Sequence, residues 1–68
     1  MSDLTLYHKT NFKEGQHILY LAKNGVRLKH EVIITTEEIQ SSKDIYELMS
    51  KAIESLKDLN KGEINGQD

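Results

Sequence analysis

The stretch HILYLAKNGVRLKHEVII, residues 17–34, decides the fold, because it holds two apolar runs on either side of Asn24-Gly25. A two-residue type I′ turn requires positive φ at both central residues, and Asn-Gly is a preferred pair for it. With these two residues as the loop, the sequence predicts a β-hairpin whose strands run over about 17–23 and 26–35.

The turn also predicts which residues of the two strands face each other. A slip by one residue would place Leu21 beside Arg27 and move apolar residues off the shared face, so the register is well specified. The predicted pairs are Leu21 with Leu28, Leu19 with His30, His17 with Val32, Ala22 with Arg27, Tyr20 with Lys29, and Ile18 with Glu31.

A first strand is predicted upstream of the hairpin. The alternation in DLTLYHKTNF favours a strand over about 4–10, and residues 11–16 supply a turn in which Gly15 adopts positive φ. Consecutive strands usually lie side by side, so the three strands form an antiparallel meander.

The hydrophobic period changes in the C-terminal half. Apolar residues recur at helical spacing and predict an amphipathic helix over about 42–60. Ser41 or Ser42 is expected to cap its start, and Gly62 to end it. Residues 35–40 stay open, because TTEE at 35–38 has capping-box spacing but also suits a longer third strand or a turn. The stripe contains Ile45, Leu48, Met49, Ala52, Ile53, Leu56 and Leu59.

The element order β-β-β-α predicts an α+β fold in which one helix packs on one face of a three-stranded antiparallel sheet. Residues 1–61 form one small domain, and residues 62–68 form a disordered polar tail. The predicted core from the sheet comprises Leu4, Leu6, Leu19, Leu21, Leu28 and Val32.

The chain has 68 residues and no cysteine, so disulfides and zinc–thiolate sites are excluded. A core of this size rarely contributes more than about 3–5 kcal/mol, which makes stabilisation by a partner or by homodimerisation a reasonable expectation. No apolar run has the length of a membrane span, and the start of the chain lacks signal-peptide features. We therefore expect a cytoplasmic protein.

Charge is divided unevenly along the chain. Residues 1–35 carry a formal charge of +2 and residues 36–68 carry −4, within a net charge of −2. Such asymmetry suits either ordinary solvated surfaces or a basic surface opposed to an acidic one.

The histidines, serines and glycines do not form the pattern of a metal, catalytic or phosphate-binding site. The predicted register puts His8, His17 and His30 on the helix-covered face, with His17 and His30 as diagonal neighbours, but no carboxylate is expected there to complete a metal site. Ser41 and Ser42 are better explained as helix caps, and the glycines have no phosphate-binding spacing. We expect no catalytic residue, no cofactor, no metal and no small-molecule substrate.

The sheet face without a helix is the predicted binding surface. Tyrosine and arginine, which are enriched at interface hot spots, occur there among aliphatic residues. An ordinary solvated sheet face is the plain alternative. The residues expected to contact a partner are Tyr7, Ile18, Tyr20, Arg27, Lys29 and Ile33.

Two functions use this face. The first is a small regulator or inhibitor, of the kind bacteria and their phages encode, that occludes a partner protein; the face could also form a homodimer. The second is nucleic-acid binding, with cations on phosphates and tyrosines stacking on bases. In element order alone, the fold resembles the DNA-binding module of some phage-type integrases. Few cations offset by acids disfavour this second function. A minor option is that the acidic outer helix face binds a basic groove.

Overall fold

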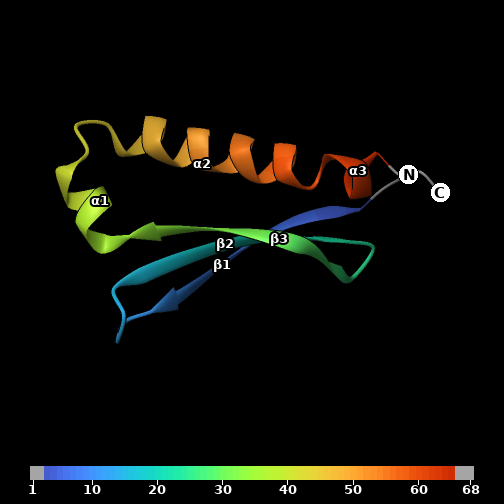
Figure 1. Ribbon diagram of the computed structural model, residues 1–68, viewed down its shortest axis with the longest axis horizontal. Coiled ribbons are helices and arrows are strands. Elements are labelled where there is room, and N and C mark those ends of the chain that lie inside the picture. The colour runs from blue at the N-terminus through green and yellow to red at the C-terminus, as the bar shows by residue number, and fades with distance from the viewer. Residues whose placement is uncertain (1–2, 66–68) are drawn as a thin grey trace.

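The computed structural model describes residues 3–65 and shows a three-stranded antiparallel sheet followed by helices, so the predicted α+β class is confirmed (Figure 1). The strands lie in the order β1-β2-β3, which is a meander. The elements are β1 (Leu4–Asn11), β2 (Gln16–Lys23), β3 (Val26–Thr35), α1 (Thr36–Ser41), α2 (Ile45–Leu59) and α3 (Lys61–Ile64).

The turns have the backbone conformation that the sequence predicts. Asn24 and Gly25 have φ of 53° and 84°, as a type I′ turn requires, and Gly15 has φ of 66° in the turn between β1 and β2. The strands agree with the predicted ranges to within one residue at each end.

The predicted register holds only beside the turn. Ala22 pairs with Arg27 as expected, but Tyr20 pairs with Glu31 and not with Lys29. Between these two pairs β2 advances by two residues and β3 by four, so β3 contains a bulge around residues 28–30. Beyond the bulge, Leu19 pairs with Val32, Ile18 with Ile33, and His17 with Ile34.

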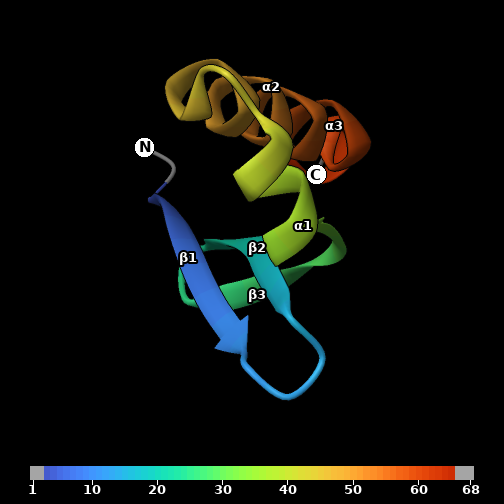
Figure 2. The ribbon, with the colours of Figure 1, turned by 90° about the vertical axis from the view of Figure 1, so that its left-hand side faces the viewer.

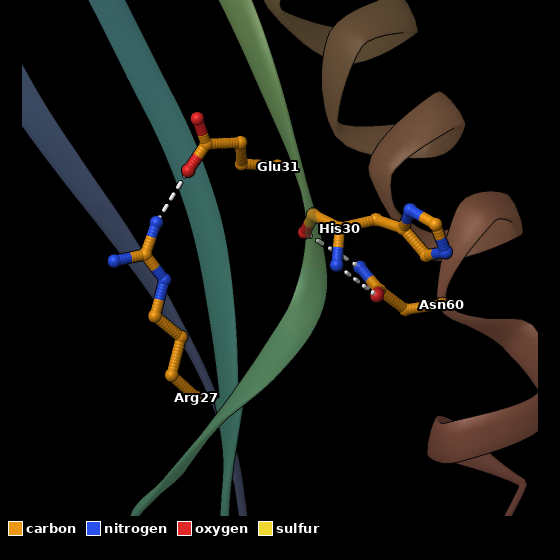
Figure 3. A network of polar contacts seen from close by, with 4 residues as sticks. All are labelled: Arg27, His30, Glu31 and Asn60. Carbon is orange, nitrogen blue, oxygen red and sulfur yellow. Dashed lines mark hydrogen bonds and ion pairs between the residues drawn. The ribbon is translucent and has the colours of Figure 1, made fainter.

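Helix-end side chains hold the bulge in place. The Oδ1 atom of Asn60 accepts from the backbone N–H of His30 at 3.0 Å, and its Nδ2 donates to the carbonyl of the same residue at 3.2 Å (Figure 3). Glu63 Oε1 accepts from the backbone N–H of Lys29 at 3.1 Å. The side chains thus pair backbone groups of the bulge that have no ladder partner on β2.

The helical half is divided into three helices, where the sequence predicted one. Thr35 and Glu38 form a reciprocal capping box that starts α1, so this alternative for residues 35–40 is correct. The expected cap at Ser41 or Ser42 is wrong, because the Asp44 side chain accepts from Glu47 N–H and starts α2.

The C-terminal residues also differ from expectation. Gly62 does not end the helix by turning left-handed but lies within α3. Ile64 packs against the core, so the structured region continues beyond the predicted boundary at residue 61. Residues 66–68 of the predicted disordered tail lie outside the described residues.

The core lies between the sheet and α2, which contacts β2 and β3. Two corrections apply to the predicted core. Leu6 on β1 stays 44% exposed, because α2 packs mainly on β2 and β3, and Ile34 is buried although the sequence did not place it in the predicted core. The buried apolar residues that form it are Leu19, Leu21, Leu28, Ile34, Ala52 and Leu56.

The Cα atoms extend over 40 × 24 × 15 Å, and the view down the shortest axis shows one layer of helix stacked on one sheet (Figure 1). In the described part of the chain, the helices lie on one side of the sheet and leave the other side uncovered (Figure 1). Among residues 3–65 no helix has the length and apolar character needed to cross a membrane.

Candidate functional site

The uncovered side of the sheet, here called the open face, is defined by the side chains that alternate with the core residues. Leu19 and Leu21 point to α2, so their neighbours on β2 point away from it. The ladder places three residues of each strand around the middle of this face: Thr5, Tyr7, Lys9, Ile18, Tyr20, Ala22, Arg27, Glu31 and Ile33.

Three side chains form a layered stack at the centre of the open face. Tyr7 and Tyr20 are directly opposite on β1 and β2, and their rings stack with centroids 5.2 Å apart and an interplanar angle of 12°. The Arg27 guanidinium lies over the Tyr20 ring, with its central carbon 4.1 Å from the centroid. This aromatic–cation contact fixes the arginine against the sheet.

Arg27 is also paired with Glu31, four residues further along β3 (Figure 3). The bulge makes this pair, because it brings Glu31 opposite Tyr20 at the position that the sequence assigned to Lys29. The guanidinium therefore has both an aromatic and an acidic partner within the chain. The positive charge that the sequence suggested for this face is largely compensated.

The other end of the open face is aliphatic. Ile18 and Ile33 are directly opposite each other on β2 and β3, and Ile33 is 44% exposed. Lys9 of β1 lies opposite Ile18 and borders this apolar pair. The open face thus combines an aromatic centre, an aliphatic end and one internally balanced ion pair.

The structure brings five of the six predicted partner-binding residues together. Tyr7, Ile18, Tyr20, Arg27 and Ile33 belong to the ladder of the open face. Lys29 does not, because it lies in the bulge without a ladder partner and its backbone N–H bonds to Glu63.

The histidines differ from the predicted arrangement. His17 is beside His8, with Nε2 of His8 and Nδ1 of His17 3.0 Å apart, whereas His30 lies in the bulge on the side of the helix (Figure 3). The His8 and His17 ring centroids are 5.2 Å apart. Within residues 3–65 no group of three or more histidine, cysteine or acidic residues is placed to hold a metal ion.

The serines near the first helix bond to the backbone. Ser41 Oγ donates to the carbonyl of Glu37 at 2.9 Å, and Ser42 Oγ donates to that of Asp44 at 3.0 Å. Glu38 is engaged by the capping box. These contacts give each group a structural role at the break between α1 and α2.

Comparisons of the chain with protein-family models, with curated proteins and with solved structures give no match. The open face is therefore interpreted from its own geometry. Sequence reasoning missed the Arg27–Glu31 pair, because the bulge that creates it is bonded by Asn60 and Glu63, which lie 30 and 34 residues further along the chain than their partners His30 and Lys29.

Proposed function

We propose that this protein is a small non-enzymatic regulator that binds another protein through the open face and acts by occluding a surface of that partner. The observation that carries the proposal is the arrangement of exposed aromatic and aliphatic side chains on a sheet face that no helix covers. Large exposed apolar patches on a small domain mark interaction sites.

The stack of Tyr7, Tyr20 and Arg27 supports a preorganised binding surface. A ring held between two neighbours loses little conformational entropy when a partner covers it. Tyrosine and arginine are also enriched among the residues that dominate binding energy. The chain contains no cysteine and needs no oxidising compartment, so we place the interaction in the cytosol of a bacterial or phage-infected cell.

A site-specific crosslinking experiment tests the surface. A photoreactive amino acid at Ile33 is expected to capture the partner in cells, whereas the same group at Tyr46, which is 86% exposed on α2, is expected not to. With the captured partner purified, Ile33→Ser should raise the Kd about tenfold, since hot-spot residues each contribute more than about 1 kcal/mol.

The Tyr46→Ser variant is the matched control, because it removes a similar exposed apolar side chain from the helix. Both variants must keep the far-ultraviolet circular dichroism spectrum of the wild type. Capture through Tyr46 alone, or an unchanged Kd for Ile33→Ser, would show that the open face is not the binding surface.

Nucleic-acid binding is the second candidate, and the stacked tyrosines bordered by Lys9 favour it. It predicts binding of a labelled single-stranded oligonucleotide that weakens as salt rises. The Arg27–Glu31 pair opposes it by balancing a central cation. An unchanged fluorescence anisotropy at low salt excludes this function.

A further inference from the structure

The two edges of the sheet differ in how they are protected. Along β3, a bulge interrupts the strand and the backbone N–H groups of Lys29 and His30 bond to side chains from the helix ends. Along β1, the pairing with β2 is continuous from Leu4 to Asn11. Proteins commonly block an exposed edge by bulges, proline, charges or a covering element, and β1 has a single charged residue, Lys9.

The backbone groups that β1 leaves unpaired can be identified. Asn24 N–H donates to the carbonyl of Asp3 at 2.8 Å, so these two residues form a hydrogen-bonded pair. Hydrogen-bonded pairs alternate along an antiparallel ladder, and the odd residues of β1 therefore bond to β2. The N–H and C=O groups of Leu4, Leu6, His8 and Thr10 point outward from the sheet edge.

Side chains on both faces of β1 are exposed. Leu6 points to the helix side, where α2 packs mainly on β2 and β3, and Tyr7 on the open face is exposed to the same extent. Figure 2 shows β1 at one edge of the sheet, with the helices displaced toward the other strands. A strand added beside β1 would cover apolar surface above and below the sheet.

We propose that β1 pairs with β1 of a second copy, antiparallel and about a two-fold axis at Leu6, to give one continuous sheet through the dimer. In this register Leu6 pairs with its own copy, and Leu4 pairs with His8 in both directions. All of these residues present outward backbone groups, so each pairing forms hydrogen bonds that the monomer lacks.

The charges of β1 and the residue before it favour a second copy of the same strand as the partner of this edge. The residues from Asp3 to Asn11 contain one acid and one base, Asp3 and Lys9. The two-fold axis at Leu6 places Asp3 of each chain directly opposite Lys9 of the other. The backbone N–H of Asp3 donates to Oδ1 of Asn24 at 3.1 Å, and this bond positions the start of the strand. An isologous contact requires such self-complementarity.

The small core supports association as well. Six apolar residues form the buried cluster within residues 3–65, and domains near this size commonly depend on oligomerisation for stability. The dimer does not depend on the proposed function, because its contacts are made by the edge of β1, whereas the Ile33 test concerns the open face.

A charge-exchange experiment tests the pairing. Sedimentation velocity at low salt is expected to show a concentration-dependent monomer–dimer equilibrium for the wild type. Asp3→Lys alone and Lys9→Asp alone each set like charges opposite each other twice in the dimer, and each should weaken dimerisation about tenfold or more. Mixing the two variants restores both opposite-charge pairs, so a heterodimer should form at wild-type strength.

Two further variants keep the test decisive. Lys13→Asp makes the same charge change in the turn after β1 and is expected to leave the dimer intact. His8→Pro removes an outward N–H without cutting a bond to β2, so it should abolish the dimer and preserve the circular dichroism spectrum. A wild type that stays monomeric at millimolar concentration, or a dimer that both His8→Pro and the charge variants retain, would overturn the proposal.

Discussion

Asn60 shows how one side chain joins a helix to a strand. It is 1% exposed, ends α2, and uses its amide to bond both backbone groups of His30 and the carbonyl of Leu56. Buried polar groups cost free energy unless they are paired, and every polar atom of this side chain has a partner. The residue therefore stabilises the bulge of β3 and the end of α2 together.

The Asn60→Asp variant tests this role with almost no change in shape. A carboxylate can still accept from the His30 N–H, but it faces the carbonyls of His30 and Leu56 without a proton to donate. We expect a loss of about 1–3 kcal/mol in the free energy of unfolding, measured by urea denaturation. Asn65→Asp makes the same change at an exposed position and should have little effect. Equal losses in the two variants would contradict the bridging role.

At the scale of elements, the hairpin turn and the C-terminal helix α3 each contain a glycine but differ in the backbone conformation they require. Gly25 has positive φ in the hairpin turn, where a side chain is strained, although no atom lies within 4 Å of an added Cβ. Gly62 is in α3 with a negative φ, and an added Cβ there also meets nothing within 4 Å. The two glycines are therefore alike in available space and differ only in conformation.

The same substitution at these glycines should have opposite effects. Gly25→Ala is expected to lower the free energy of unfolding by about 1 kcal/mol, through the left-handed conformation alone. Gly62→Ala is expected to raise it by about 0.5–1 kcal/mol, because alanine loses less entropy in a helix. Thermal melting of both variants measures this difference. A stabilised Gly25→Ala would show that the turn relaxes to another type.

The sequence predicted the three strands and the main helix α2, but it did not predict the bulge that interrupts β3. Asn24-Gly25 located the hairpin, and the period of the apolar residues located α2. The bulge of β3 was not predictable from local sequence, because Asn60 and Glu63 impose it through tertiary hydrogen bonds. The open face retained five of its six residues since a bulge of this kind preserves the alternation of side chains, and only the pairing within the face changed.

At the scale of the molecule, stability depends on a short list of side chains. Leu19, Leu21 and Leu56 are at most 2% exposed and form the centre of the core. Within residues 3–65 six buried apolar side chains form one cluster between the sheet and α2, so each of these leucines contributes a large part of the free energy of unfolding. The sequence analysis identified all three, because helical and strand periods mark the inward positions of regular elements.

Truncation of one core leucine should unfold a large share of the molecules. Leu56→Ala is expected to cost about 2–5 kcal/mol, comparable to the whole stability expected of a domain this size. Leu59→Ala, one turn later and 52% exposed, should cost less than about 1 kcal/mol and serves as the control. Urea denaturation followed by circular dichroism compares them. A folded Leu56→Ala with wild-type midpoint would show that the core is held elsewhere.

The bulge of β3 also determines which changes in chain length this fold tolerates. It adds two residues to β3 relative to an unbroken hairpin. Successive side chains point to opposite sides of a sheet, so a change of two leaves Val32 toward the helix and Ile33 on the open face. Insertion or deletion of one residue between Leu28 and Glu31 would exchange these positions. Related chains should therefore vary here in steps of two.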